Sequence, residues 1–379
     1  MLILALMVAA CVDPFRIEDT SPPDMLVVEG VFSNQLKRHQ ISLSRATKLG
    51  DKKVVPETGA TVTISDQHGE IISLEEGAGG IYETPELSAA AGNTYTLKIR
   101  TSTGEEYSSA AVAFKDGPDI GDVYAEYINR DDPEKKGIAV YVDTEDPENN
   151  THFYRWNYVE TYEVHAPFPS NWVWLGGTDI EFRTEGIDTC YVTDTLSTVL
   201  LRNTKNLEQD KISGQVIRFI PAASYITRYR YNILVQQFCL SEESYLYWEN
   251  LRLISEEQGS LADIQPGSLS GNIFSITNSS ETVLGFFEVG RVSEKRLVFS
   301  AITFYNDGFK MPKNIRGECN TLEPIAVQQQ DLEEAMRNHG HNMWIWEVYG
   351  MSPAITVQLM PKSCCDCRDL GPTERPPYF

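Results

Sequence analysis

Cys11 is the residue whose surroundings specify a chemistry most clearly, because ten consecutive apolar residues precede it. A helix of that length covers about 15 Å, roughly half of a bilayer core, so the run predicts a secretory signal. Val8-Ala9-Ala10-Cys11 has the small residues and the cysteine of a bacterial lipobox, in which the cysteine is diacylated on its thiol and then becomes the new N-terminus. We expect residues 1–10 to be a lipoprotein signal peptide and Cys11 to attach the protein to a membrane. The alternatives are a secreted protein that is cleaved nearby, or a buried first strand that contains an ordinary cysteine.

The other cysteines form an even set, which in an exported chain favours up to three disulfides. They are Cys190, Cys239, Cys319, Cys364, Cys365 and Cys367. The alternatives are partly free thiols, or a metal site that combines the last cysteines with His339 and His341. The spacing matches no standard zinc module, so we expect disulfides and no metal.

A second group of candidate residues is aromatic. Residues 165–177 carry Phe168, Trp172 and Trp174 between prolines and glycines. Aromatic side chains on loops are good anchors for sugars or protein partners, so these three are candidate binding residues. The alternative is a loop that folds back to close the end of a sandwich.

Catalytic motifs are missing from the sequence, which has no G-x-S-x-G, H-E-x-x-H or G-x-x-x-x-G-K-[ST] run. The 54 acidic residues guarantee close carboxylate pairs by chance, so no acid–base dyad can be selected. We expect a protein that is not an enzyme and that uses no cofactor. An envelope hydrolase with scattered carboxylates is the minor alternative.

Composition limits the remaining classes of protein. The chain has 379 residues, which predicts two domains, and its 41% hydrophobic content excludes intrinsic disorder. A formal net charge of -22 argues against nucleic-acid binding, because no surplus of Lys and Arg is present to neutralise phosphates.

Short alternating runs with turn signals predict an immunoglobulin-like β-sandwich over residues 25–117, after an acidic tether over residues 11–24. Within it, Asp66–Gly69 is a predicted hairpin turn and Tyr95 a candidate tyrosine corner. Residues 118–379 are expected to form a larger β-rich, sandwich-like domain with helical insertions. The fold class is therefore mainly β.

Two kinds of periodicity divide that larger domain. In residues 153–164 the aromatic side chains alternate with polar ones, which predicts a strand with an aromatic core face. Residues 241–257 change to a helical period with Ser241 as candidate N-cap, and a short helix is expected near 328–338.

Several motifs in this order resemble one family. They are LVVEGVFS (26–33), GATVTISD (59–66), GGIYETPEL (79–87), GNTYTLKI (92–99), SEESYLYW (241–248), SGNIFSI (270–276), VLGFFEVGRVSEKRLVF (283–299) and the ending CCDCRDLGPTERPPYF (364–379). Together with the lipobox, the chain resembles the Bacteroidota lipoproteins grouped as domain of unknown function 4249, whose genes commonly neighbour those of TonB-dependent receptors.

The resemblance implies an outer-membrane lipoprotein that is an accessory or ligand-capture component of a TonB-dependent receptor, with the receptor β-barrel as partner. It implies no catalytic residues. The alternative is a free-standing lipoprotein that binds a glycan or a peptide, with Phe168, Trp172 and Trp174 in its site.

Overall fold

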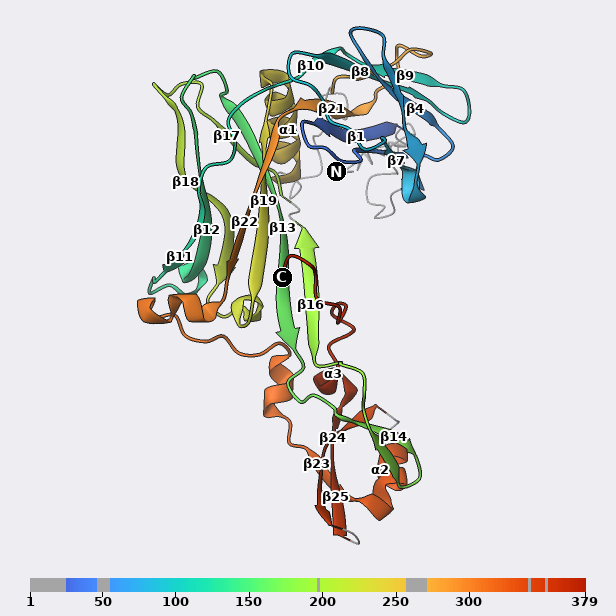
Figure 1. The fold of residues 1–379 in the computed structure, drawn as a ribbon, viewed down its shortest axis with the longest axis vertical. Helices are drawn as coiled ribbons and strands as arrows, with labels where there is room; N and C mark the ends of the chain where they lie inside the picture. The colour runs from blue at the N-terminus through green and yellow to red at the C-terminus, as the bar shows by residue number, and fades with distance from the viewer. Residues whose placement is uncertain (1–24, 46–54, 196–197, 257–270, 340–341, 352–353) are drawn as a thin grey trace, which may run out of the picture.

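The structure, a computed structural model, describes residues 25–45, 55–195, 198–256, 271–339, 342–351 and 354–379. The expected signal peptide, Cys11 and the tether up to residue 24 lie outside the described residues. The described chain is mainly β, as the sequence predicts, and its strands gather into three units along one axis (Figure 1).

The first unit, called the first sandwich, consists of two sheets that share one core. One sheet contains β1 (Leu26–Ser33), β2 (Gln40–Arg45), β3 (Val55–Pro56), β6 (Glu75–Glu76), β7 (Ile81–Glu83) and β21 (Leu284–Gly290). The other sheet contains β4 (Thr61–Asp66), β5 (Ile71–Ser73), β8 (Thr94–Arg100), β9 (Glu106–Ser109), β10 (Val112–Ala113) and β20 (Ile273–Ser275).

Two local predictions for the first sandwich are confirmed. The Asp66 carboxylate accepts hydrogen bonds from the backbone N–H groups of His68 and Glu70, at 2.9 Å each, and so closes the β4–β5 hairpin turn. The Tyr95 hydroxyl accepts a 2.9 Å hydrogen bond from the N–H of Ala90, five residues upstream, as in a tyrosine corner.

The boundary predicted at residue 117 leaves this sandwich incomplete. β21 pairs in parallel with β1 from Val27 opposite Leu284 to Ser33 opposite Gly290, and β20 pairs with β9. Ile273 and Phe287 are buried in the same core. The first sandwich therefore combines residues 25–115 with residues 273–290, a pairing that local periodicity cannot indicate.

The second unit, called the second sandwich, also has two sheets around a single core. They contain β11 (Val123–Ile128), β12 (Gly137–Asp146) and β18 (Asp210–Pro221) on one side, and β13 (Phe153–His165), β16 (Thr189–Thr195), β17 (Leu200–Asn203), β19 (Tyr231–Cys239) and β22 (Val292–Phe299) on the other. The predicted aromatic face of β13 lies in this core, where Tyr154, Trp156, Tyr158 and Tyr162 are all buried.

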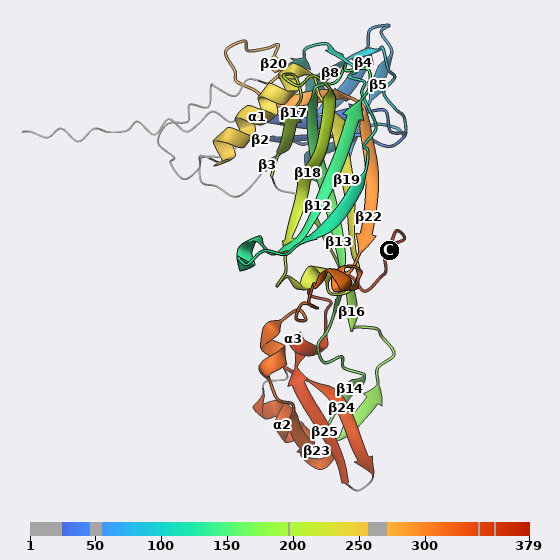
Figure 2. The same cartoon turned by 90° about the vertical axis from the view of Figure 1, so that its left-hand side faces the viewer.

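Helix α1 (Glu242–Glu256) follows β19 and confirms the prediction for 241–257. The Ser241 hydroxyl accepts a 3.1 Å hydrogen bond from the N–H of Ser244, which supplies the expected N-cap. Tyr247, Leu251 and Ile254 form the apolar stripe of the helix, and they pack with Phe286 of the first sandwich. Helix α1 therefore lies at the junction of the two sandwiches (Figure 2).

The third unit, called the C-terminal module, lies at the end of the molecule opposite the first sandwich (Figure 1). It contains the hairpin β14 (Trp172–Gly176) and β15 (Asp179–Phe182), the sheet β23 (Ile325–Gln328), β25 (Ala354–Pro361) and β24 (Met343–Met351), and the helices α2 (Leu332–Asn338) and α3 (Lys362–Cys365). Helix α2 confirms the prediction near 328–338. In the described residues, 3-10 helices cover Ala78–Gly80, Pro133–Lys135, Tyr225–Thr227, Ala301–Asp307, Gly317–Thr321 and Gln329–Asp331.

Candidate functional site

Part of the aromatic segment 165–177 forms the first strand of a β-hairpin in the C-terminal module. The prediction of an exposed loop there is therefore wrong. Trp172 and Trp174 lie two residues apart on β14, so they share one face of that strand. Both rings are half-buried and pack against the core that contains Leu332 and Met336 of α2. The two tryptophans therefore help to hold the hairpin on the C-terminal module. The alternative, a loop that closes the end of a sandwich, is right that these side chains pack inward but wrong about where they pack.

Phe168 does not join the other two aromatic residues. Its ring packs edge-on against Trp346 at 5.0 Å between ring centroids, in a separate cluster with the buried disulfide Cys319–Cys364. The three predicted binding residues thus divide between two clusters. A binding role remains a prediction for Trp172 and Trp174, whose half-buried rings still reach the surface.

A groove of about 250 Å³ opens where β14 faces β24. Its lining is mostly aromatic and thioether side chains with two arginines, namely Trp172, Val173, Trp174, Arg183, Met336, Met343, Trp344, Ile345 and Arg368. The C-terminal module holds four of the six tryptophans of the chain, and three of them line this groove. Half-buried indole rings around a hollow form a contact surface for a ligand with apolar faces.

Cationic side chains surround Trp344 at this groove. The Arg183 guanidinium lies 4.5 Å from the centre of the Trp344 ring, and Lys362 Nζ lies 5.2 Å from it. Both distances fall within the range of cation–π attraction. Arg183 donates to the backbone carbonyls of Ser170 and Trp172, at 3.1 and 3.4 Å.

Of the three cationic side chains near the groove, only Arg368 forms ion pairs with carboxylates. Arg368 donates to both carboxylate oxygens of the buried Asp366 and forms a longer ion pair with Glu185. Arg183 and Lys362 make no ion pair with any carboxylate among the described residues. Burial lowers the pKa of Arg183 and the nearby positive charge of Arg368 lowers it further, whereas the nearby carboxylates of Glu185 and Asp366 raise it. Arg183 and Lys362 therefore add positive charge beside the groove, where the nearby carboxylates of Asp366 and Glu185 form their ion pairs with Arg368.

A second hollow, of about 480 Å³, shares Arg368 with the first. Its lining also includes Lys362, Ser363, Asp366 and Asp369.

Sequence patterns did not identify Arg183, Trp344 or Lys362 as site residues. The available signal was the run Trp344-Ile345-Trp346, which repeats the aromatic alternation of Trp172-Val173-Trp174.

Two disulfides fix the module and its connection to the rest of the chain. Cys319 is bonded to Cys364 within the module, and Cys190 of β16 is bonded to Cys367 across a separation of 177 residues. The disulfide prediction is confirmed for these four cysteines. It is wrong for Cys239 and Cys365, which are buried free thiols in separate apolar clusters. Burial raises the pKa of each thiol to about 12, so both are unreactive at neutral pH.

The metal alternative finds no support in the described part of the chain. Its residues include no group of three or more His, Cys, Asp or Glu side chains that could hold a metal ion. Cys364 and Cys367 are bonded in disulfides, and His341 lies outside the described residues.

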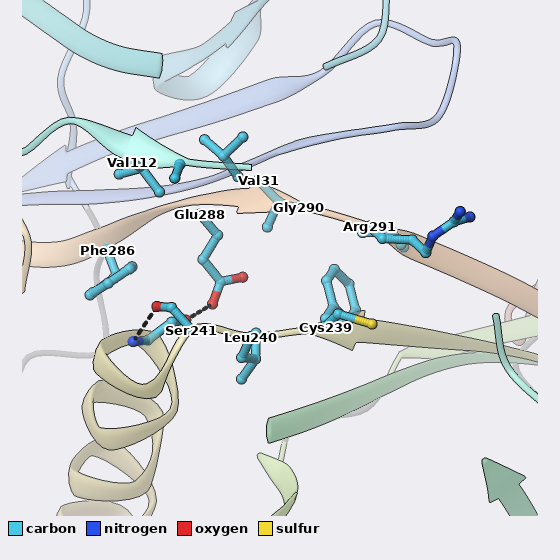
Figure 3. Close-up of a pocket in the computed structure, with 14 residues that line it drawn as sticks. Val31, Val112, Cys239, Leu240, Ser241, Phe286, Glu288, Gly290 and Arg291 are labelled. Carbon is cyan, nitrogen blue, oxygen red and sulfur yellow. Dashed lines mark hydrogen bonds between the residues drawn. The ribbon is translucent and has the colours of Figure 1, made fainter. Parts of the chain in front are cut away.

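The junction of the two sandwiches contains a buried ion pair. The Arg155 guanidinium of β13 donates a 2.6 Å hydrogen bond to the Glu288 carboxylate of β21, and these side chains are only 5% and 6% exposed. Ser244 and Trp248 of α1 donate to the other carboxylate oxygen. Figure 3 shows Glu288 reaching from the first sandwich toward the beginning of α1. The ion pair thus joins both sandwiches and α1 at one point.

The cavity beside this ion pair is too small for a ligand. It is lined by residues such as Val31, Phe286 and Cys239 and has a volume of about 20 Å³ (Figure 3), which leaves room for about one water molecule. The junction is therefore a structural joint. The groove of the C-terminal module is the better candidate for binding.

No helix in the described residues is long and apolar enough to span a membrane.

Comparison with curated proteins finds no match. Among solved structures, the chain is similar to the crystal structure of a DUF4785 family protein from Legionella pneumophila, with 10% identity and a TM-score of 0.18, over 56% of this chain and 52% of that chain. The family model described as Domain of unknown function (DUF4249) matches residues 12–296, and the chain belongs to that family.

Proposed function

We propose that this protein is a non-enzymatic lipoprotein of the bacterial outer membrane. In this proposal it captures a ligand as an accessory to a TonB-dependent receptor. The observation that carries the proposal is the tryptophan-lined groove of the C-terminal module, with Arg183 and Lys362 beside it. Concave sites with apolar walls and a few placed polar groups are typical of ligand binding.

The arrangement of the three units supports a role in which the groove is held away from the anchor. Residue 25, the first described residue, lies in the first sandwich, and the C-terminal module lies at the opposite end of the molecule (Figure 1). A lipid on Cys11 would place the first sandwich near the membrane, with 13 residues of tether between Cys11 and Met25.

Rigid connections along the molecule support the same role. The Arg155–Glu288 ion pair joins the two sandwiches, and the Cys190–Cys367 disulfide joins the second sandwich to the segment that follows α3. Fixed joints would let the groove reach a receptor in one orientation, which lowers the entropy cost of association.

Affinity purification from detergent-solubilised outer membranes tests the proposal. The tagged full-length protein is expected to co-purify with a TonB-dependent β-barrel in near-stoichiometric amount, identified by mass spectrometry. The variant Cys11→Ser is the control for anchoring, and it is expected to leave the membrane fraction and to lose the barrel. Recovery of the wild-type protein alone after mild crosslinking would contradict the accessory role. Retention of Cys11→Ser in the outer membrane at high salt would contradict the lipid anchor.

A further inference from the structure

We propose that the groove of the C-terminal module binds a carboxylate-bearing sugar, such as a uronic acid residue within an oligosaccharide. This inference rests on the proposed function, because it specifies the chemical class of the captured ligand. It follows from two features of the groove, namely two cations that form no ion pair among the described residues and the aromatic lining.

The charge of the groove favours an anion. Arg368 is already committed to Asp366 and Glu185. Arg183 is held by backbone carbonyls that carry no net charge, and Lys362 Nζ contacts the face of Trp344. Two cations thus lie beside the groove without a carboxylate partner among the described residues, in a chain whose net charge is -22. A guanidinium and a carboxylate form charge-assisted hydrogen bonds, so a ligand carboxylate is the complementary group.

The lining of the groove favours a sugar ring. Trp172 and Trp174 present half-buried indole rings, and Met336 and Met343 add thioether side chains. Trp344 instead holds the two cations, because Arg183 and Lys362 lie over its ring. Such surfaces suit the C–H faces of a pyranose. The volume of about 250 Å³ is below the range of about 300–1,000 Å³ for sites that enclose a drug-sized ligand. It therefore suits one sugar residue. The neighbouring hollow shares Arg368 and would receive the next sugar residue with its carboxylate toward Lys362, away from Asp366 and Asp369 of the same lining.

An extended acidic peptide is the competing occupant, and the edge of the sheet argues against it. A peptide strand would pair with the backbone of β24 where that strand faces β14. The Ser170 hydroxyl already donates a 2.6 Å hydrogen bond to the carbonyl of Ile345 on β24. A sugar would contact side chains rather than the backbone of β24, so this hydrogen bond does not obstruct its binding.

Tryptophan fluorescence of the purified full-length protein measures the binding. The probe is a short oligogalacturonate, and the matched probe is its fully methyl-esterified form, which has the same rings without the negative charge. We expect saturable binding of the acid and at least about tenfold weaker binding of the ester. An oligoglutamate peptide is the third probe, and no binding of it is expected.

Variants of Lys362 test the site, because this side chain is exposed and its replacement leaves the core intact. Lys362→Glu is expected to weaken binding of oligogalacturonate by about tenfold or more, which equals about 1.4 kcal/mol, and Lys362→Arg is expected to retain it. The matched control is Lys310→Glu, a charge reversal at an exposed lysine of the second sandwich, which should bind as the wild type does. Circular dichroism and the melting temperature establish that each variant is folded.

Three results would overturn the inference. They are equal binding of acid and ester, preferential binding of oligoglutamate, and no binding of oligogalacturonate by the folded wild type. In each case co-purification with the receptor barrel is unaffected, so failure of the sugar inference and failure of the accessory role are distinguishable.

Discussion

Replacing Glu288 with alanine removes the acceptor at the junction of the two sandwiches. Arg155 loses its carboxylate partner at 2.6 Å, and the donors of Ser244 and Trp248 lose their shared acceptor. The guanidinium cannot move readily into water. It lies 4.0 Å from the ring centre of Phe238 and 4.4 Å from that of Trp248, and its side chain is 5% exposed. Glu288→Ala therefore leaves a buried positive charge without a counter-ion.

The expected loss is large because the remaining charge stays desolvated. Breaking a buried ion pair by removing one partner costs about 3–5 kcal/mol, and the two stranded donors place Glu288→Ala in the upper part of that range. Replacing both charges, in Arg155→Met with Glu288→Leu, removes the uncompensated charge. We expect the double variant to recover part of the lost free energy of unfolding.

Urea unfolding followed by tryptophan fluorescence and circular dichroism measures this effect. The control is Glu145→Ala, which breaks the exposed ion pair with Lys211 and should leave the unfolding midpoint unchanged. If Glu288→Ala unfolds at the same urea concentration as Glu145→Ala, the ion pair does not hold the two sandwiches together. If the double variant is less stable than Glu288→Ala, the desolvation argument is wrong.

Further predictions concern the thiols and the first sandwich. Alkylation in urea without a reductant should modify Cys239 and Cys365, as mapped by mass spectrometry of the peptides. The other cysteines of residues 190–367 should react only after reduction. Modification of a different pair of cysteines would contradict the disulfide pairing. Burial raises the pKa of both free thiols from 9.0 to about 12 in the folded protein. Their contribution to the free energy of unfolding is therefore fully present below pH 9 and is lost as the pH rises toward 12, because the thiols of the unfolded chain ionise first. Thermal melting over that range should show a falling midpoint, with a smaller fall in Cys239→Ala, and an equal fall in that variant would refute the assignment. The isolated fragment 25–117 lacks β20 and β21 and should give no cooperative melting transition, whereas a chain joining residues 25–117 to residues 271–290 through a flexible linker should give one.

Local patterns predicted the elements whose partners lie nearby in the chain. The alternation in β13 placed its aromatic face correctly, because one side of that strand is buried in the core. The N-cap and apolar stripe of α1 were also readable, since capping and helical period are local properties. The parallel pairing of β1 with β21 was not readable. The two strands are separated by about 250 residues of sequence, and a buried run such as residues 284–290 does not identify its neighbour.

The candidate site was predicted only in part, for a similar reason. Pro167 and Pro169 made the segment before Trp172 look like a loop, although the alternation of Trp172 and Trp174 is typical of a strand. Arg183 and Trp344 belong to segments that meet only through the tertiary fold. Cysteine spacing likewise predicted oxidation but could not specify the pairing, which depends on the geometry of Cα positions in the folded chain.

Photocrosslinking in living cells tests the central claim most directly, namely that the C-terminal module is the part of the molecule that meets the receptor. A photoreactive phenylalanine analogue replaces Tyr349, which is 48% exposed on β24, and in a matched variant it replaces Tyr305, which is 72% exposed in the second sandwich. The account predicts an adduct between the Tyr349 variant and a TonB-dependent β-barrel, and no such adduct from the Tyr305 variant. An adduct from the Tyr305 variant alone, or none from either variant, would contradict it.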